Sequence, residues 1–396
     1  MKKITLREVE NRHDWNIFFK LPWKIYASDP LWVPPLLFDL KKQLSKNRNP
    51  FFETADARFW IAYKDKECVG RIAAIVNHLH NDHYEERTGF FGYFECINDE
   101  EVSEALLNAA HAWLFEQGME TVRGPVNLSL NNECGLLTNG FHRTPILQMN
   151  YNPKYYLKLI ENYGYVKEHD LYAFYVSDEI ISDQKIMSRL KRLTDLIIHK
   201  EGISFRNFNT KDFKNEVERI RVLFNDYMSD NWGFVPLSKK EFDFIAQSLK
   251  PVLVKELAIF AEINGETVGC SIALPDLNQV IKKMNGKLFP FGLLKFILNK
   301  NNITDLRVML MGISKPYRKR GLEAVFYYQT ITQGVKKGFT GAELSWVSET
   351  NLAMIRELEN LHAKLYKRYR VYSKDIKTQT HFSVNKPLYE KQVLAD

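Results

Sequence analysis

Hydrophobic and polar positions follow the same order twice along the chain. The run FWIAYKDKECVGRIAAIV begins at Phe59, and the run AIFAEINGETVGCSIALP begins at Ala258. Each predicts a strand, a short polar turn and a second strand that opens with a Val-Gly pair, Val69-Gly70 or Val268-Gly269. We therefore expect two similar β-hairpins, one in each half of the chain.

The elements that follow each hairpin also repeat. Apolar periodicity predicts a strand, a helix that ends at a glycine, and another strand in both halves. The expected elements are strand 89–96, helix to Gly118 and strand 121–126, then strand 306–313, helix 322–337 and strand 342–347. The repeated order indicates two related domains rather than one continuous sheet, in an α/β (α+β) fold.

A charge-rich stretch of helical pattern, DQKIMSRLKRLTDLIIHK, lies between the two halves. We place the first domain at residues 1–175, a helical linker at 176–204 and the second domain at 205–396.

Composition limits the possible functions. Hydrophobic residues make up 45% of the chain, which is enough for a substantial core, and 55 basic against 48 acidic residues give a net charge of +7. This mild excess does not by itself predict nucleic-acid binding, whereas an anionic cofactor or a membrane surface would suit it. The four cysteines are widely separated, which favours reduced thiols over disulfides or a zinc site. The N-terminus has no signal-peptide pattern and no apolar run is long enough to span a bilayer, so we expect a cytoplasmic protein.

The stretch GISKPYRKRGLEAVFYYQ, from Gly312, joins an apolar strand to a helix through a basic turn. Free backbone amides and the helix dipole favour an anion at such a helix start. Gly321 permits a positive φ or a close approach, and Arg318, Lys319 and Arg320 add charge-assisted donors. The sequence therefore favours a phosphate site, with a solvated basic turn as the alternative.

These residues resemble the pyrophosphate loop of the GCN5-related N-acetyltransferases (GNATs). Arg318 and Gly321 match the Arg and the first Gly of the family pattern, but Glu323 stands at its last small position. The resemblance implies that Arg318 to Gly321 bind the pyrophosphate of acyl-CoA. It also implies that a splayed strand, Met311, Gly312 and Ile313, positions the thioester.

The next segment extends the resemblance from about residue 205 to 388. SWVSETNLAMIRELENLHAKLY supplies Asn351, Met354 and Leu361 at the family's spacing, but Leu358 stands where a tyrosine often protonates the leaving thiolate. RTGFFGYFEC and NNECGLL resemble bacterial acetyltransferase-like proteins, so the chain resembles a tandem GNAT. Each domain is then expected to hold a mixed, mostly antiparallel sheet flanked by helices. The first half has the acidic INDEEVSEALL in place of the loop, so it is expected to lack a phosphate site.

Three glutamates are candidates for the base that deprotonates an amine: Glu95, Glu133 and Glu343. Glu349 is a comparable candidate. The alternatives are a pair of Glu95 with Arg87 and a helix-capping role for Glu133. We expect His78, His80 and His83 to be exposed on a polar turn, and we expect no metal site.

An insertion over 277–302, LNQVIKKMNGKLFPFGLLKFILNKNN, separates two strands that fewer residues join in the first half. Its apolar residues are rimmed by lysines. This pattern suits peripheral contact with an anionic membrane or the wall of an acyl-chain site, and the alternative is a helix packed between the domains.

The leading hypothesis is an N-acyltransferase that moves an acyl group from acyl-CoA (acetyl-CoA or longer) to an amine, which the insertion suggests to be lipid-like. One alternative is an aminoacyl-tRNA-dependent ligase of the Fem type, which would need a broad basic surface. Another is a CoA-binding sensor without catalysis, to which Glu323 and Leu358 would point. Nucleic acid is not an expected partner of the acyltransferase.

Overall fold

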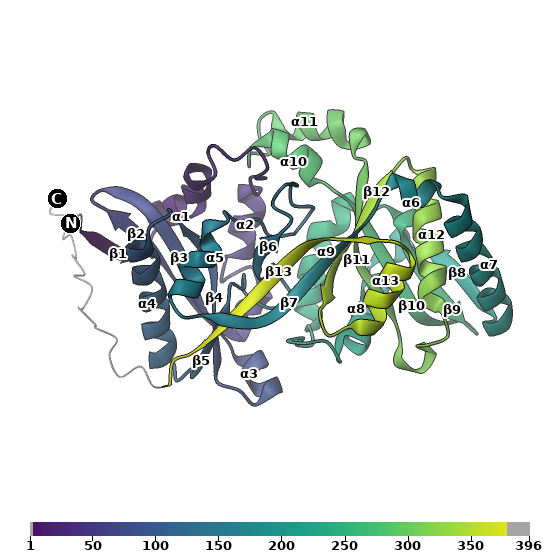
Figure 1. The fold of residues 1–396 in the computed structure, drawn as a ribbon, viewed down its shortest axis with the longest axis horizontal. Coiled ribbons are helices and arrows are strands. Elements are labelled where there is room, and N and C mark those ends of the chain that lie inside the picture. Colours follow the sequence, from purple (N-terminus) through teal and green to yellow (C-terminus); the bar gives the residue numbers. More distant parts are fainter. Residues whose placement is uncertain (1–2, 378–396) are drawn as a thin grey trace.

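The computed structural model describes residues 3–377, and its strands form one mixed sheet across the whole molecule (Figure 1). The strand order is β1-β2-β3-β4-β5-β13-β7-β12-β11-β10-β9-β8, and β6 pairs with β13 beside this path. The expectation that the two halves do not share one continuous sheet is therefore wrong. The repeated order of elements is nevertheless present on each side of the sheet.

The strands of the first half are β1 (Ile4–Glu8), β2 (Ala55–Lys64), β3 (Glu67–Asn77), β4 (Thr88–Cys96), β5 (Thr121–Gly124), β6 (Leu136–Asn139) and β7 (Val166–Val176). The helices of this half are α1 (Arg12–Ile25), α2 (Leu37–Gln43), α3 (His78–Tyr84), α4 (Glu100–Glu116) and α5 (Tyr155–Asn162). The predicted hairpin and the strand–helix–strand series after it are both confirmed here.

The strands of the second half are β8 (Ile203–Asn207), β9 (Ala258–Ile263), β10 (Glu266–Pro275), β11 (Asp305–Ile313), β12 (Gly341–Ser348) and β13 (Lys364–Asp375). Its helices are α6 (Asp178–Ser182), α7 (Gln184–Glu201), α8 (Phe213–Met228), α9 (Lys239–Leu249), α10 (Asn278–Met284), α11 (Gly292–Asn299), α12 (Leu322–Lys336) and α13 (Leu352–Asn360). The second predicted hairpin and its series are confirmed as well.

The two halves exchange their last strands. β7, from the first half, pairs with β12 of the second half, and β13, from the end of the second half, pairs with β5 of the first half. β7 and β13 also pair with each other, from Tyr175↔Lys364 to Val166↔Ser373. Each half thus completes its sheet with a strand from the other, which joins the halves into one body.

Apolar side chains on both faces of the sheet hold the helices in place. In the first half, α1 and α2 cover one face through Phe18, Phe19 and Leu40, and α4 and α5 cover the other. In the second half, α8 packs on one face, while α7, α12 and α13 pack on the other. The predicted boundaries at 175 and 204 stay a prediction, and residues 378–396 of the expected second domain lie outside the described part.

The insertion forms two helices, α10 and α11, which Figure 1 shows at the upper edge of the molecule. Val280, Ile281, Met284 and Ile303 form a small buried cluster beneath them. Among residues 3–377, no helix is long and apolar enough to cross a membrane.

The prediction for the histidines is wrong in one respect. His78, His80 and His83 lie on α3 rather than on a turn, and His80 is buried against Phe90. Burial lowers the pKa of His80 to about 4. The described residues contain no group of three or more side chains that could hold a metal ion.

Candidate functional site

The two central strands of the second half separate where the predicted thioester site lies. The parallel pairing of β11 and β12 runs from Asp305↔Gly341 to Val308↔Leu344 and stops there. An irregularity in the β10–β11 register falls at Met309. The rest of β11, which holds Met311, Gly312 and Ile313, therefore has an edge that does not pair with β12.

The loop after β11 has the geometry that the sequence predicts for a phosphate site. Lys319 and Gly321 have φ of 62° and 84°, so their amides turn toward the start of α12. No acceptor among the described residues binds the backbone amides of Lys319 to Leu322. The Glu323 carboxylate accepts only from its own backbone N–H, so it does not cap those amides.

Carboxylates of the same chain bind the cations of this loop. Arg318 donates to Asp230 at 2.9 Å and to the Tyr227 carbonyl at 3.1 Å. Lys315 also donates to Asp230, at 3.1 Å, and Arg320 donates to Glu201 at 2.8 Å. A bound pyrophosphate would therefore take the place of Asp230 beside Arg318 and Lys315.

The corresponding helix of the first half has no open amides of this kind. The Asp99 side chain accepts from Val102 N at 3.3 Å at the start of α4, and Lys64 pairs with Asp99 at 2.5 Å. The protein's own carboxylate occupies the position that an anion would take. The absence of a phosphate site from the first half stays a prediction.

A cavity of about 1000 Å³ lies on the sheet face that α1, α2, α8 and α9 cover. Its wall is mostly apolar and comes from both halves of the chain. Representative lining residues are Trp32, Phe213, Phe224, Phe242, Leu293, Phe296, Met309, Met311 and Trp346. The cavity reaches the point where β11 and β12 separate.

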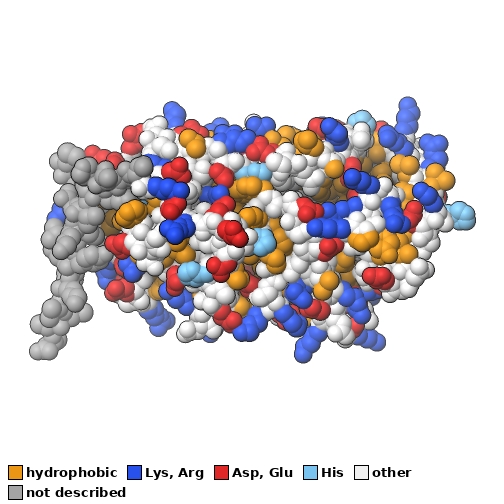
Figure 2. All heavy atoms as spheres, turned by 90° about the horizontal axis from the view of Figure 1, so that it is seen from below, with side chains coloured by type: hydrophobic (Ala, Val, Ile, Leu, Met, Phe, Trp, Pro, Cys, Tyr) orange, Lys and Arg blue, Asp and Glu red, His pale blue; other side chains and the backbone are white. Residues whose placement is uncertain are grey.

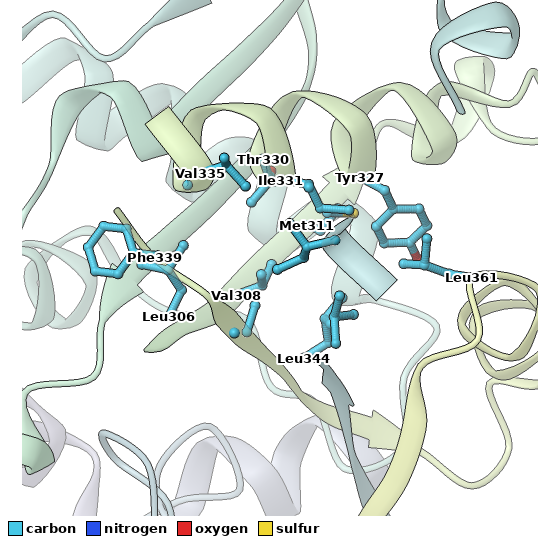
Figure 3. A pocket seen from close by; sticks show the side chains of 15 residues that line it. Leu306, Val308, Met311, Tyr327, Thr330, Ile331, Val335, Phe339, Leu344 and Leu361 are labelled. Carbon is cyan, nitrogen blue, oxygen red and sulfur yellow. The ribbon is translucent and has the colours of Figure 1, made fainter. Parts of the chain in front are cut away.

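A second, small cavity of about 30 Å³ lies under α12, on the opposite face of the same strands (Figure 3). Val308, Met311 and Leu344 line both cavities. Figure 3 shows these three side chains between the strands and α12, near Tyr327. These three apolar side chains therefore form a layer that belongs to the walls of both cavities.

Glu133 lines the large cavity from the loop between β5 and β6. Its Oε2 accepts from Asn127 Nδ2 at 3.2 Å, and burial raises the pKa of the carboxyl, against the effect of Asn127 and Arg307. The buried hydroxyl of Tyr93, which also lines the cavity, has no hydrogen-bond partner among the described residues. Glu133 does not cap a helix, so that alternative is wrong.

Glu95 lines the same cavity on β4. Its carboxylate accepts from Tyr156 at 2.8 Å and pairs with Arg71 at 3.5 Å. Burial raises the pKa of Glu95, and Arg71 opposes the rise. The alternative pair of Glu95 with Arg87 is wrong, because Arg87 pairs with Glu120.

Glu343 lies apart from Glu95 and Glu133. It is fully buried on β12, is hydrogen-bonded to Ser345 at 2.5 Å and to Tyr366, and does not line the cavity. Glu349 lies at a surface ion pair with Lys167. The structure therefore brings two of the three predicted carboxylates to one cavity.

Asn351 is the N-cap of α13, and Leu358 lies on this helix. The Asn351 side chain caps α13 by accepting from Met354 N at 3.2 Å, and Asn351 also lines the large cavity. Leu358 is fully buried in the core beneath α12, in the same apolar cluster as Tyr327. Asn351 therefore has a structural role at this helix start.

Arg307 is a site residue that the sequence analysis did not select. It is buried on β11 and donates to the carbonyl groups of Leu147 and Gln148 at 2.8 and 3.1 Å, and to Ser345 Oγ at 3.2 Å. It holds the loop before α5 against the cavity wall. A lone arginine in the apolar run DLRVMLMGI was the signal that could have found it.

Two bacterial proteins are similar in sequence to this chain over nearly its whole length. It is 34% identical over 377 residues to protein YghO of Escherichia coli, covering 94% of this chain and 95% of YghO. It is also 34% identical over 364 residues to the bacterial ceramide synthase of Caulobacter vibrioides, covering 90% and 94%. No model of a known protein family matches.

Solved structures share the fold at low sequence identity. A tandem GNAT protein from the clavulanic acid biosynthesis pathway has a TM-score of 0.56 at 10% identity, covering 94% of this chain and 98% of that one. A GNAT region of a fungal β-N-acetylglucosaminidase has a TM-score of 0.57 at 12% identity, covering 94% and 38%. The chain therefore has the tandem GNAT fold, and it belongs to the family of protein YghO and the bacterial ceramide synthase.

Proposed function

We propose that the protein is a CoA-dependent N-acyltransferase that joins a long acyl chain to the amino group of a long-chain amine. In this reaction the amine nitrogen bonds to the thioester carbonyl carbon, the carbon–sulfur bond breaks, and CoA leaves as a thiol. The observation that carries the proposal is the apolar cavity of about 1000 Å³ at the splay of β11 and β12.

The size and wall of this cavity favour long-chain substrates. Pockets for small organic ligands usually measure about 300–1,000 Å³. An acetyl group would leave most of this volume without apolar contact, whereas two alkyl chains would bury against the aromatic and aliphatic wall. The relative named as a ceramide synthase supports the same substrate class, because a ceramide is an N-acylated long-chain amine.

The donor site follows from the loop before α12. The open amides of Lys319 to Leu322, with Arg318, would bind the pyrophosphate, and the unpaired edge of β11 would hold the acyl-CoA arm. The thioester would then lie beside Val308, Met311 and Leu344, the apolar layer that belongs to both cavity walls. Backbone amides on that edge of β11 would stabilise the oxyanion.

The acceptor amine must lose a proton before it attacks. Glu133 and Glu95 reach the cavity, and burial raises the pKa of each carboxyl toward the range of a general base. Glu133 is the better candidate, because Arg71 and Tyr156 already bind Glu95 whereas only Asn127 binds the Glu133 carboxylate.

The candidate acid that would protonate the leaving thiolate is Glu357 on α13. Tyr327 on α12 donates to Glu357 on α13 at 3.4 Å, close to the buried Leu358. Burial and the neighbouring Glu323 raise the pKa of Glu357 to about 7. A carboxyl protonated near neutral pH could supply the proton that a tyrosine supplies in the resembling family.

A direct assay tests the function. Purified protein is incubated with palmitoyl-CoA and sphinganine, and the N-acyl product and free CoA thiol are measured by mass spectrometry and thiol titration. Acetyl-CoA and a short amine such as butylamine serve as matched substrates. We expect product from the long-chain pair and little from the short pair.

Melting-temperature shifts test binding of the acyl-CoA donor separately from the transfer reaction. Palmitoyl-CoA should raise the melting temperature by mass action, and Arg318→Ala should abolish the shift. Arg318→Ala should leave the melting temperature of the free protein within a few degrees. Equal shifts with acetyl-CoA and palmitoyl-CoA would contradict the long-chain assignment, and binding without any product would indicate a CoA sensor.

The Fem-type alternative receives no support from the surface. Figure 2 shows acidic and basic side chains interspersed over the face that it displays, rather than one broad basic field. Binding of tRNA in the same melting assay, without a response to any acyl-CoA, would favour that ligase instead.

A further inference from the structure

The outer side of the insertion is the most hydrophobic surface segment among the described residues. Large apolar side chains of α11 and the turn before it point to solvent. Their exposed fractions are 69% for Phe289, 68% for Phe291, 54% for Leu294, 53% for Ile297 and 67% for Leu298. No other described segment of this length exposes as many large apolar side chains. Such a surface marks an interaction site.

The charge of this segment has one sign. Residues 277–304 contain five lysines and no aspartate or glutamate, so they account for +5 of the formal +7 of the chain. None of the five lysines forms an ion pair with a described acidic residue. Lys283 binds Asn299 Oδ1 at 2.8 Å and Lys295 binds the Lys283 carbonyl at 3.0 Å, which keeps both cations beside α11.

The inner side of the same segment belongs to the large cavity. Met284, Leu288, Leu293 and Phe296 line it. Trp23 of α1 donates to Asn285 Oδ1 at 2.7 Å, which ties the turn after α10 to the first half. The segment thus has apolar side chains on both sides, those that line the cavity and those exposed to solvent.

We propose that α10 and α11 dock on the surface of a membrane that contains anionic lipids, and that they form the entrance through which a long-chain amine leaves the bilayer for the cavity. This inference rests on the proposed function for the identity of the amine, but docking itself does not. Phe291, Leu294 and Leu298 would enter the boundary between headgroups and acyl chains, and the lysines would lie at the level of the anionic phosphates.

A second copy of the chain fits this surface less well. A twofold contact would bring the lysine-rich segments of both copies together without any acidic partner on the segment. An anionic lipid surface supplies the missing negative charge and accepts the apolar side chains. An anionic membrane therefore suits both the positive charge and the exposed apolar side chains of the segment.

Vesicle flotation tests docking without acyl-CoA or amine. The intact protein should float with vesicles of phosphatidylglycerol and phosphatidylcholine, but not with phosphatidylcholine alone. The triple variant Phe291→Ser/Leu294→Ser/Leu298→Ser should lose most binding, and Lys287→Gln/Lys300→Gln should weaken it roughly 10-fold. These positions do not line the cavity.

Matched variants control for folding and for general surface effects. Leu196→Ser/Val222→Ser/Val166→Ser changes apolar side chains of similar exposure, 67%, 55% and 64%, on other surfaces. Lys20→Gln/Lys214→Gln removes the same charge elsewhere. Both controls should bind vesicles like the intact protein, and melting temperatures confirm that all variants fold.

Activity distinguishes the two proposals. The triple serine variant should acylate a detergent-dispersed amine at the normal rate but lose most of its rate on amine embedded in anionic vesicles. Absence of flotation by the intact protein would overturn docking while leaving the acyltransferase proposal intact. A dimer that the triple variant converts to a monomer, again without flotation, would assign the surface to a second copy and also overturn docking.

Discussion

Three buried polar side chains in the wall of the large cavity differ in how far their hydrogen-bonding groups are satisfied. Glu133, Tyr93 and Arg307 come from different segments and meet the same cavity, where burial makes each polar group costly unless it has a partner or a task. Arg307 has partners in two carbonyl groups and Ser345, whereas the Tyr93 hydroxyl has none among the described residues. Tyr93 and Glu133 therefore have hydrogen-bonding capacity left for a ligand.

Glu133→Gln should remove the proposed general base while keeping the side-chain volume and the hydrogen bond from Asn127. We expect kcat to fall about 10²–10⁴-fold, as is typical for loss of general base catalysis, with KM for palmitoyl-CoA nearly unchanged. Steady-state kinetics on the long-chain amine measure both constants. Glu95→Gln is the matched variant. A large loss in Glu95→Gln with normal activity in Glu133→Gln would assign the base to Glu95.

Asp276 should make stability depend on pH. Burial raises its pKa to about 7, so the folded state holds the proton more tightly than the unfolded state, whose carboxyl has a pKa near 3.8. The free energy of unfolding should therefore fall as pH rises from about 4 to 7 and then level off. Asp276 Oδ1 accepts from both Leu147 N and Asn278 N, at 2.9 and 3.2 Å, and asparagine retains that oxygen.

Asp276→Asn should consequently be more stable than the natural chain at pH 8, by on the order of 2–4 kcal/mol, and by only about 1 kcal/mol at pH 4.5. Urea denaturation of both proteins at the two pH values measures the difference. A difference that is the same at both pH values would show that Asp276 is ionised in the folded state.

At the scale of elements, the loop between β11 and α12 has open backbone amides, but two of its cations are paired with a carboxylate. Asp230, on the segment after α8, binds Lys315 and Arg318 across the loop. These two cations hold the pKa of Asp230 below its usual range through their hydrogen bonds, Arg318 first. The carboxylate and a pyrophosphate would compete for the same donors.

Asp230→Asn should therefore tighten CoA binding several-fold, with little change in stability because Asp230 is an exposed ion-pair partner. Isothermal titration with CoA measures the affinity. Glu201→Gln, which releases Arg320 from a similar pair, is the comparison variant. Weaker binding by Asp230→Asn would show that Asp230 instead orients Arg318 for the phosphate.

At the scale of the whole molecule, the exchange of β7 and β13 makes the two halves interdependent. β13, from the second half, pairs with β5, β6 and β7, so its removal would take a pairing partner from three strands of the first half. A chain that breaks these pairings exposes backbone donors and acceptors along the middle of the sheet. We infer that the protein unfolds as one cooperative unit.

Fragments 1–177 and 178–396 should each fail to fold alone and should recover the native fold when they are produced together. Circular dichroism and calorimetry of the single fragments and of the mixture test this, and the uncut chain should show a single calorimetric transition. Two separate transitions in the uncut chain, or an independently folded fragment 1–177, would contradict the interdependence.

The sequence by itself determined the local features of the fold. The hairpins around Val69-Gly70 and Val268-Gly269 and the strand–loop–helix at Gly321 depend on neighbouring residues, whose periodicity and turn chemistry are visible in the chain. The repeated order of elements in the two halves came from the same local information.

Only the tertiary structure decided how these elements share one site. The exchange of β7 and β13, the pairing of Asp230 with Arg318, and the meeting of Glu133 with β11 join residues that are far apart in sequence. Such contacts depend on which strands become neighbours, and strand periodicity does not encode the choice of partner, because every strand edge offers the same donors and acceptors. The same reason explains why the sequence predicted the two related halves but not the joining of their sheets.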